Sequence, residues 1–165
     1  MTMNYKKLVF LLGMVFIFST IVPAQDAKYV GAAKCKMCHN KPEKGGQYAS
    51  WTAGPHAKAM SVLKADEAKN PKCLKCHSTA AGADQSLVAT ITVEEGVSCE
   101  SCHGPGSLYK VATTMKDMKL AMSKGLIMPD EKVCKKCHNE GSPNYKGFNF
   151  KEYSAKIAHK DPTKK

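Results

Sequence analysis

All eight cysteines of this 165-residue chain fall in four copies of one five-residue motif, Cys-x-x-Cys-His. In this spacing two thiols add to the vinyl groups of one porphyrin, and the adjacent histidine coordinates the iron from one side. The pattern therefore predicts four covalently bound c-type haems. The attachment cysteines are Cys35, Cys38, Cys73, Cys76, Cys99, Cys102, Cys134 and Cys137, and the proximal histidines are His39, His77, His103 and His138.

Two other uses of cysteine stand as alternatives to haem attachment. Paired Cys-x-x-Cys sequences are common zinc ligands, and eight cysteines in a small exported chain could form four disulfides. Neither alternative requires a histidine directly after every second cysteine, whereas haem attachment does. We therefore favour haem over zinc and over disulfides.

The sixth ligand of each iron determines which chemistry a haem supports. The chain has six histidines, and four of them are proximal ligands, so only His56 and His159 remain as distal imidazoles. The other two irons bind a methionine, another ligand or nothing. Met115 and Met128 are the better candidates, with ordinary core packing as the alternative for each. A thioether ligand raises the haem potential, and an empty position leaves the iron open to small molecules.

Residues 1–24 have the composition of an export signal. Two lysines precede an apolar run from Leu8 to Val22, and small residues follow it. We predict cleavage after about Ala24, one tetrahaem domain over residues 25–165, and a periplasmic or otherwise exported location. A retained membrane anchor is the alternative, although the run is near the short end of the ~17–25 residues that a span needs. No later segment is apolar enough to span a membrane.

The basic residues of the chain are all lysines. There are 25 of them against 14 Asp and Glu, which gives a net charge of +11. Without arginine the chain lacks the guanidinium fork that reads guanine edges and clamps phosphates, so we expect no nucleic-acid partner. Four haems add about eight propionate charges, which offset most of the lysine excess. An acidic partner is the alternative use of these lysines.

Few side chains are available for an apolar core. Leu, Ile, Val and Phe make up 18 of the 141 residues after position 24, a share typical of disordered chains when charge is high. Four porphyrins would supply the missing core. The predicted fold is mostly α with extensive coil, because turn sequences separate the motifs. We expect helices over 47–51, 56–69, 109–124 and 151–158, a helical turn over each motif, and a strand pair or extended loop over 87–93.

Three further stretches resemble a known family. They are Tyr29-Val30-Gly31-Ala32-Ala33-Lys34-Cys35, Gly54-Pro55-His56-Ala57-Lys58-Ala59-Met60, and the sequence from Glu95 to Gly106 around the third motif. Together they resemble the tetrahaem cytochromes c related to the electron acceptor of hydroxylamine oxidoreductase. The resemblance implies a periplasmic electron carrier with closely paired, mostly histidine-ligated haems, and it puts His56 and His159 at distal positions. After the third motif, Ser107-Leu108-Tyr109 stand where many relatives have a histidine.

Two functions fit these features. The first is a relay of single electrons between redox partner proteins, such as a periplasmic or membrane quinol dehydrogenase and a terminal reductase, without enzymatic turnover. The second is a haem reductase that acts on a small nitrogen oxide or on hydroxylamine at an iron without a distal ligand. The sequence forms no obvious substrate pocket, and only His56 could serve as a general acid if it is not a ligand. We therefore favour electron transfer.

Overall fold

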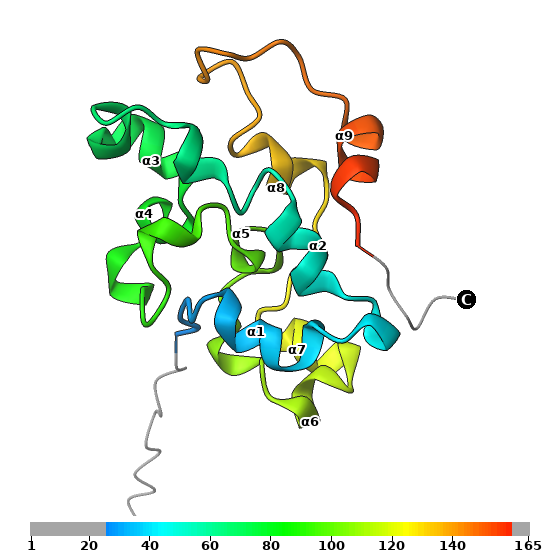
Figure 1. The fold of residues 1–165 in the computed structure, drawn as a ribbon. Helices are drawn as coiled ribbons and strands as arrows, with labels where there is room; N and C mark the ends of the chain where they lie inside the picture. The colour runs from blue at the N-terminus through cyan, green and yellow to red at the C-terminus, as the bar shows by residue number, and fades with distance from the viewer. Residues whose placement is uncertain (1–25, 160–165) are drawn as a thin grey trace, which may run out of the picture.

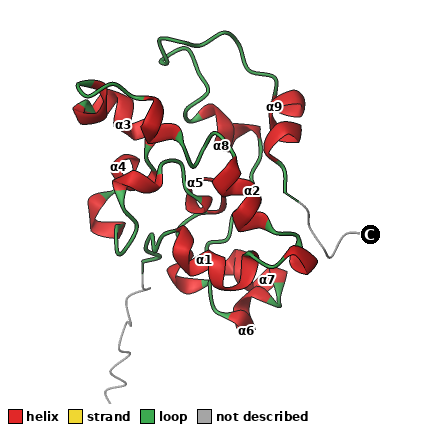
Figure 2. Ribbon diagram, in the orientation of Figure 1, coloured by secondary structure: helices red, strands yellow, loops and turns green. Residues whose placement is uncertain are grey.

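The computed structural model describes residues 26–159. The predicted export signal, residues 1–24, lies outside this range. Within the range the chain forms short helices joined by turns and long loops, and it contains no β-strand (Figure 1, Figure 2). The predicted fold class, mostly α with extensive coil, is confirmed.

Each Cys-x-x-Cys-His motif begins on a short helix, as predicted. These helices are α1 (Ala32–His39), α3 (Pro71–His77), α5 (Cys99–His103) and α8 (Glu131–Lys135). Helices α1, α3 and α5 contain their whole motifs, and residues three and four apart share one face of a helix, so both cysteines and the histidine point the same way. This is the arrangement that binding one porphyrin requires. In the fourth motif, Cys137 and His138 follow the end of α8.

The remaining helices connect the motifs. They are α2 (Gln47–Ala53), α4 (Thr79–Gly82), α6 (Ala112–Met115), α7 (Met118–Ser123) and α9 (Phe150–Ile157). Short 3₁₀ turns lie at Pro42–Lys44, Ala59–Val62, Glu67–Lys69, Gln85–Leu87, Val93–Glu95 and Gly106–Leu108. The predicted helices over 47–51 and 151–158 are confirmed by α2 and α9.

The prediction of one helix over residues 56–69 is wrong, because this segment forms turns and two 3₁₀ pieces. The carbonyl of His56 accepts a hydrogen bond from the distant Val97 N–H at 3.0 Å. The Glu67 carboxylate accepts the Lys64 N–H at 2.8 Å. A tertiary contact and a local side-chain bond therefore replace the helical bonds that residue propensity favours.

Two other expectations from the sequence are met only in part. The helix expected over 109–124 divides into α6 and α7, because the Asp117 side chain accepts the Leu120 N–H at 3.0 Å and starts a new helix. The stretch 87–93 is an extended loop, joined to Tyr29 by one isolated bridge at Val88. The strand pair is therefore absent from the described chain, and the extended-loop alternative is correct.

The attachment helices are distributed through the molecule rather than around one polypeptide core (Figure 1). Helices α3 and α4 lie together on one side, α6 and α7 lie together on another, and α9 lies at the end of the long loop that follows α8. The buried apolar residues of the described chain are Val30, Ala32, Ala80, Ile91, Tyr109, Ala121 and Leu126. Three of these seven are alanines, so the polypeptide supplies very little core of its own.

Candidate haem sites

The eight cysteines are free thiols in this structure, and seven of them are partly buried. The disulfide alternative therefore has no bridge to support it. Within residues 26–159, no group of three or more His, Cys, Asp or Glu side chains is arranged to hold a metal ion. The zinc alternative has no support from the geometry either. Free thiols paired on helix faces, together with the small core, fit covalent haem attachment.

Cysteines from different motifs lie next to each other. Cys35 of the first motif and Cys99 of the third form a hydrogen bond, which lowers the pKa of Cys35 and raises that of Cys99. Burial, followed by the neighbouring Cys76 of the second motif, raises the pKa of Cys137 in the fourth motif to about 12. The first motif is thus adjacent to the third, and the second is adjacent to the fourth.

The third and fourth motifs connect these two pairs. Burial and the charge of the nearby Cys134 raise the pKa of Cys102. Cys102 is the second cysteine of the third motif, and Cys134 is the first of the fourth. The four attachment sites therefore form a continuous series in the order first, third, fourth, second.

His56 lies near His138, the histidine of the fourth motif. Their ring centroids are 6.1 Å apart, with 64° between the ring planes. An imidazole nitrogen binds a transition metal at about 2.0 Å, so two imidazoles on opposite sides of one iron have ring centres about 6.3 Å apart. The spacing of His56 and His138 matches this value. The two rings form a candidate axial pair.

His159 lies in a similar relation to His103, the histidine of the third motif. Their ring centroids are 5.9 Å apart, with 39° between the planes. His56 and His159 thus lie near the histidines of two different motifs. The spacing again fits two ligands of one iron. No histidine is left in the sequence for the distal sides of His39 and His77.

Backbone carbonyls orient two of the proximal rings. The Nδ1 of His77 lies 2.7 Å from the Ala59 carbonyl, and the Nδ1 of His103 lies 3.0 Å from the Ile127 carbonyl. A carbonyl only accepts, so each Nδ1 carries the proton and leaves Nε2 free to bind a metal. Both rings are therefore set in the tautomer that a c-type haem needs.

The loop before the third motif positions His56. The Val97 N–H donates to the His56 carbonyl at 3.0 Å, and the Val97 carbonyl accepts the Trp51 indole N–H at 2.8 Å. Gly96 has a φ of +70°, and a Cβ there would lie 2.8 Å from the His56 carbonyl oxygen. Burial, followed by the charge of His138, lowers the pKa of His56. The neutral imidazole is the form that binds metals.

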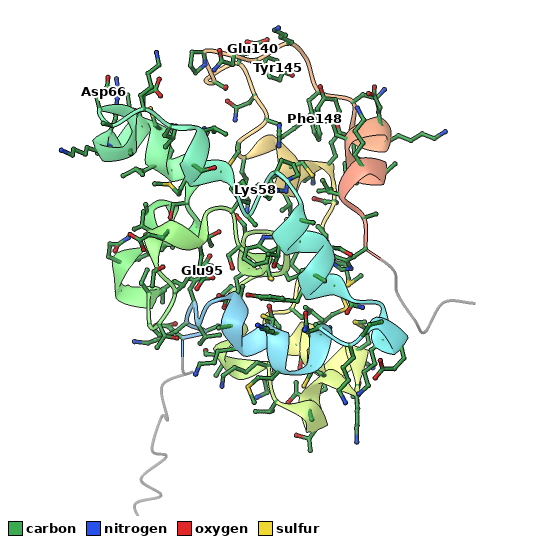
Figure 3. All side chains as sticks on the ribbon, viewed as in Figure 1. Lys58, Asp66, Glu95, Glu140, Tyr145 and Phe148 are labelled. Carbon is green, nitrogen blue, oxygen red and sulfur yellow. The ribbon has the colours of Figure 1, made fainter. Side chains whose placement is uncertain are left out.

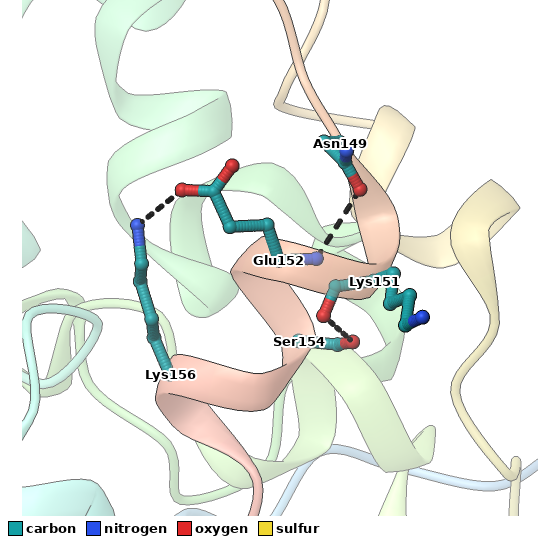
Figure 4. A network of polar contacts seen from close by, with 5 residues as sticks. All are labelled: Asn149, Lys151, Glu152, Ser154 and Lys156. Carbon is teal, nitrogen blue, oxygen red and sulfur yellow. Dashed lines mark hydrogen bonds and ion pairs between the residues drawn. The ribbon is translucent and has the colours of Figure 1, made fainter.

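The helix α9 positions His159, which lies two residues beyond its end. The Asn149 side chain accepts the Glu152 N–H at 3.2 Å, and Lys156 pairs with Glu152 at 2.7 Å (Figure 4). These contacts start the helix and support its exposed face. His159 also lines a hollow between α9 and α2, together with Asn40, Pro42, Gly45, Gly46, Ala49, Ser50 and Ala158.

Aromatic side chains surround His138. The ring of Phe148 stacks on His138 with a centroid distance of 4.9 Å and an angle of 21°, and Tyr153 of α9 lies 5.1 Å from Phe148. Phe148 lies beside α9, where the long loop returns to the body of the molecule (Figure 3). The stacking limits rotation of the His138 ring. Sequence reasoning did not foresee this contact.

The two methionine candidates have different surroundings. Met115 packs against the small cluster of Tyr109, Ala121 and Leu126, so its thioether has a packing role. Met128 is 48% exposed. Tyr109, which follows the third motif, donates its hydroxyl proton toward the Gly104 carbonyl at 2.7 Å. Its side chain is thus engaged with the backbone.

Two carboxylates beside the third motif were also missed by sequence reasoning as separate functional groups. Glu100 lies between the two cysteines of that motif and is 1% exposed. Glu95 accepts the Ala32 N–H at the start of α1, at 2.8 Å, and lies near that helix in Figure 3. Glu100 is the only acidic residue inside any of the four motifs. This acidic residue inside a motif was the feature of the sequence that could have identified Glu100.

Comparison with known proteins identifies the relatives of this chain. Residues 34–104 match the family described as cytochrome c554 and c-prime. Cytochrome c-554 of Nitrosomonas europaea is 31% identical over 154 residues, which cover 73% of this chain and 62% of that protein. The structure of reduced cytochrome c554 from Nitrosomonas europaea superposes with a TM-score of 0.51 at 27% identity, over 82% of this chain and 80% of that chain.

These similarities confirm the family resemblance inferred from the motifs, and with it four c-type haems as the cofactors. The chain spans about 62% of the length of its curated relative. Within the described residues, no helix has the length and apolar character to cross a bilayer.

Proposed function

Because this chain is a tetrahaem c-type cytochrome related to cytochrome c554, we propose that it relays single electrons between redox partner proteins in the periplasm. Each haem supplies a one-electron couple of its iron. The eight cysteines tether the four haems. His39, His77, His103 and His138 are the proximal ligands, and His56 and His159 are distal ligands.

The two histidine ring pairs are the observation that carries this proposal. His56 with His138, and His159 with His103, have the spacing of two ligands on one iron. An iron held between two protein imidazoles has no position for a substrate, so it exchanges electrons only. These two sites are central in the series of four motifs. Electrons that cross the molecule from one end to the other would pass both.

The lysines support a protein partner with an acidic surface. Residues 26–159 contain 20 lysines, and the ion pairs of this range involve two of them, Lys135 and Lys156. Most lysine ammonium groups are thus available to haem propionates and to a partner. We propose a periplasmic or membrane quinol dehydrogenase as donor and a terminal reductase as acceptor.

One observation favours a second function, the reduction of a small nitrogen oxide or hydroxylamine. The six histidines leave His39 and His77 without a histidine on the opposite side of their irons. Met115, one of the two methionine candidates, is engaged in packing. An iron without a distal protein ligand would bind a small molecule.

Stopped-flow turnover tests the choice between the two functions. The fully reduced holoprotein is mixed with an oxidised acceptor cytochrome, and separately with nitrite, hydroxylamine or nitric oxide under excess reductant. We expect the acceptor to withdraw about one electron per haem, and we expect no steady consumption of the small molecules. Sustained consumption would establish the reductase and contradict the carrier. The variant His56→Ala, which opens a further iron, is the control that shows whether the assay detects ligand binding.

A further inference from the structure

Glu100 is the largest fully buried side chain in the described part of the protein. It lies on α5, inside the third attachment motif, between Cys99 and Cys102. A carboxylate in the interior is costly unless its oxygens are fully hydrogen-bonded. We therefore ask which groups bind this carboxylate and how it affects the two neighbouring attachment cysteines.

Backbone N–H groups surround this carboxylate. One oxygen accepts from Val30 at 2.9 Å and from Gly106 at 2.6 Å, and the other accepts from Val30 at 3.0 Å and from Gly31 at 2.7 Å. Both oxygens thus act as acceptors, and backbone N–H groups replace the water that the buried carboxylate has lost.

The partners of Glu100 belong to two attachment motifs. Val30 and Gly31 directly precede α1, which carries the first motif, whereas Glu100 itself lies in the third. These are the two motifs whose cysteines Cys35 and Cys99 touch. One buried negative charge therefore lies where the first and third sites meet.

The field of this charge extends to the neighbouring side chains. Burial is the main cause that raises the pKa of Tyr29, and the charge of Glu100 raises it further. At Tyr109, burial and the charge of Cys35 raise the pKa, and Glu100 adds to both. The charges that act on Cys134 of the fourth motif are instead those of Asp130 and Glu131. The charge of Glu100 thus acts on Cys35 of the first motif and on Cys99 of the third.

We propose that Glu100 is a positioning residue that ties the first motif to the third and lowers the reduction potentials of these two haems. A ferric iron carries one more positive charge than a ferrous iron, so a nearby buried carboxylate stabilises the oxidised state. Without this charge, the first and third haems would be reduced more easily. This inference rests on haem attachment at the four motifs, as proposed above.

The test is a redox titration of holoprotein variants, followed by absorbance and by low-temperature electron paramagnetic resonance. Glu100→Gln removes the charge and keeps the size of the side chain. We expect the reduction potentials of two haems to rise and those of the other two to stay unchanged. One of the two affected haems should be the low-spin haem whose signal is lost in His159→Ala. Glu131→Gln, an exposed carboxylate on α8, is the matched control and should leave the first and third haems at their wild-type potentials.

Two further variants separate charge from structure. Gly31→Ala perturbs the same junction without removing a charge, because a Cβ there would lie 2.5 Å from a Glu95 oxygen. Glu100→Asp keeps the charge, so we expect the reduction potentials of its haems to stay close to those of the wild type. If Glu100→Gln does not bind its haems, the comparison of Glu100→Asp with the wild type still tests the proposal. Three results would overturn the proposal. The potentials of the first and third haems rise as much in Gly31→Ala as in Glu100→Gln, they rise as much in Glu100→Asp as in Glu100→Gln, or Glu100→Gln does not raise them selectively. The number of covalent haems is measured separately in the wild type and in each variant. Fewer than four haems in the wild type would contradict the proposed function and not the role of Glu100.

Discussion

His56 and His159 face different motif histidines, so each should control a separate iron. Replacing His56 with Ala removes the imidazole opposite His138. We expect one low-spin ferric signal to become high-spin and the potential of that haem to rise, because the ferric state loses a strong donor. His159→Ala should do the same to a different signal. Electron paramagnetic resonance of the two single variants and of the double variant measures this directly. An unchanged low-spin spectrum in His56→Ala would show that His56 is not a ligand.

At this scale the sequence predicted which residues could bind iron but not which ones face each other. Counting six histidines against four motifs identified His56 and His159. Their assignment to His138 and His103 depends on how loops return across the molecule, which no local pattern encodes. Met115 illustrates the same limit, because its packing against Tyr109 depends on the break at Asp117.

The helices that carry the second and fourth motifs depend on side-chain caps. Asn70 accepts the Lys72 N–H at 2.9 Å before α3, and Asp130 accepts the Val133 N–H at 3.1 Å before α8. Asn70→Ala and Asp130→Ala should each lower the free energy of unfolding of the holoprotein by about 1 kcal/mol. Chemical denaturation followed at the haem absorbance gives the value. Asp130→Asn, which retains a capping oxygen, should stay near wild type, and a loss equal to that of Asp130→Ala would contradict this role.

The turn at Gly96 should be as important for the fourth site as His56 itself. Gly96→Ala would force a Cβ to 2.8 Å from the His56 carbonyl oxygen, at a φ that favours glycine. We expect loss of the same low-spin signal that disappears in His56→Ala. The control is Gly147→Ala, whose φ is also positive but which has no atom within 4 Å of the added Cβ. Equal loss of this signal in both variants would show that backbone strain, and not the contact with His56, is responsible.

Element prediction succeeded where the determinants were local. The motif helices, α2 and α9 follow from nearby residues, and α9 has its cap at Asn149. The segment 56–69 was misassigned because its decisive hydrogen bond comes from Val97, some forty residues later in the chain. Such contacts override helix propensity, and they are the contacts that place the distal ligand.

For the whole molecule, the small polypeptide core predicts that folding depends on the haems. Of the seven buried apolar residues of the described chain, three form a cluster, Tyr109, Ala121 and Leu126, and Met115 packs against it. A core of this size cannot offset the conformational entropy of the described chain. Expression without cytochrome c maturation should give a protease-sensitive chain with little helical circular dichroism. A folded, cofactor-free monomer would contradict the view that haems form the core.

The central claim is that each of the four motifs carries one covalent haem, and intact-mass spectrometry of the purified, matured protein tests it most directly. The variants replace both cysteines of one motif with serine, for example Cys35 and Cys38 or Cys134 and Cys137. We predict four covalent haems in the wild type and three in every variant that matures, with the peptide of the altered motif unmodified. A wild-type mass with fewer than four haems, or a variant that still carries four, would contradict this account.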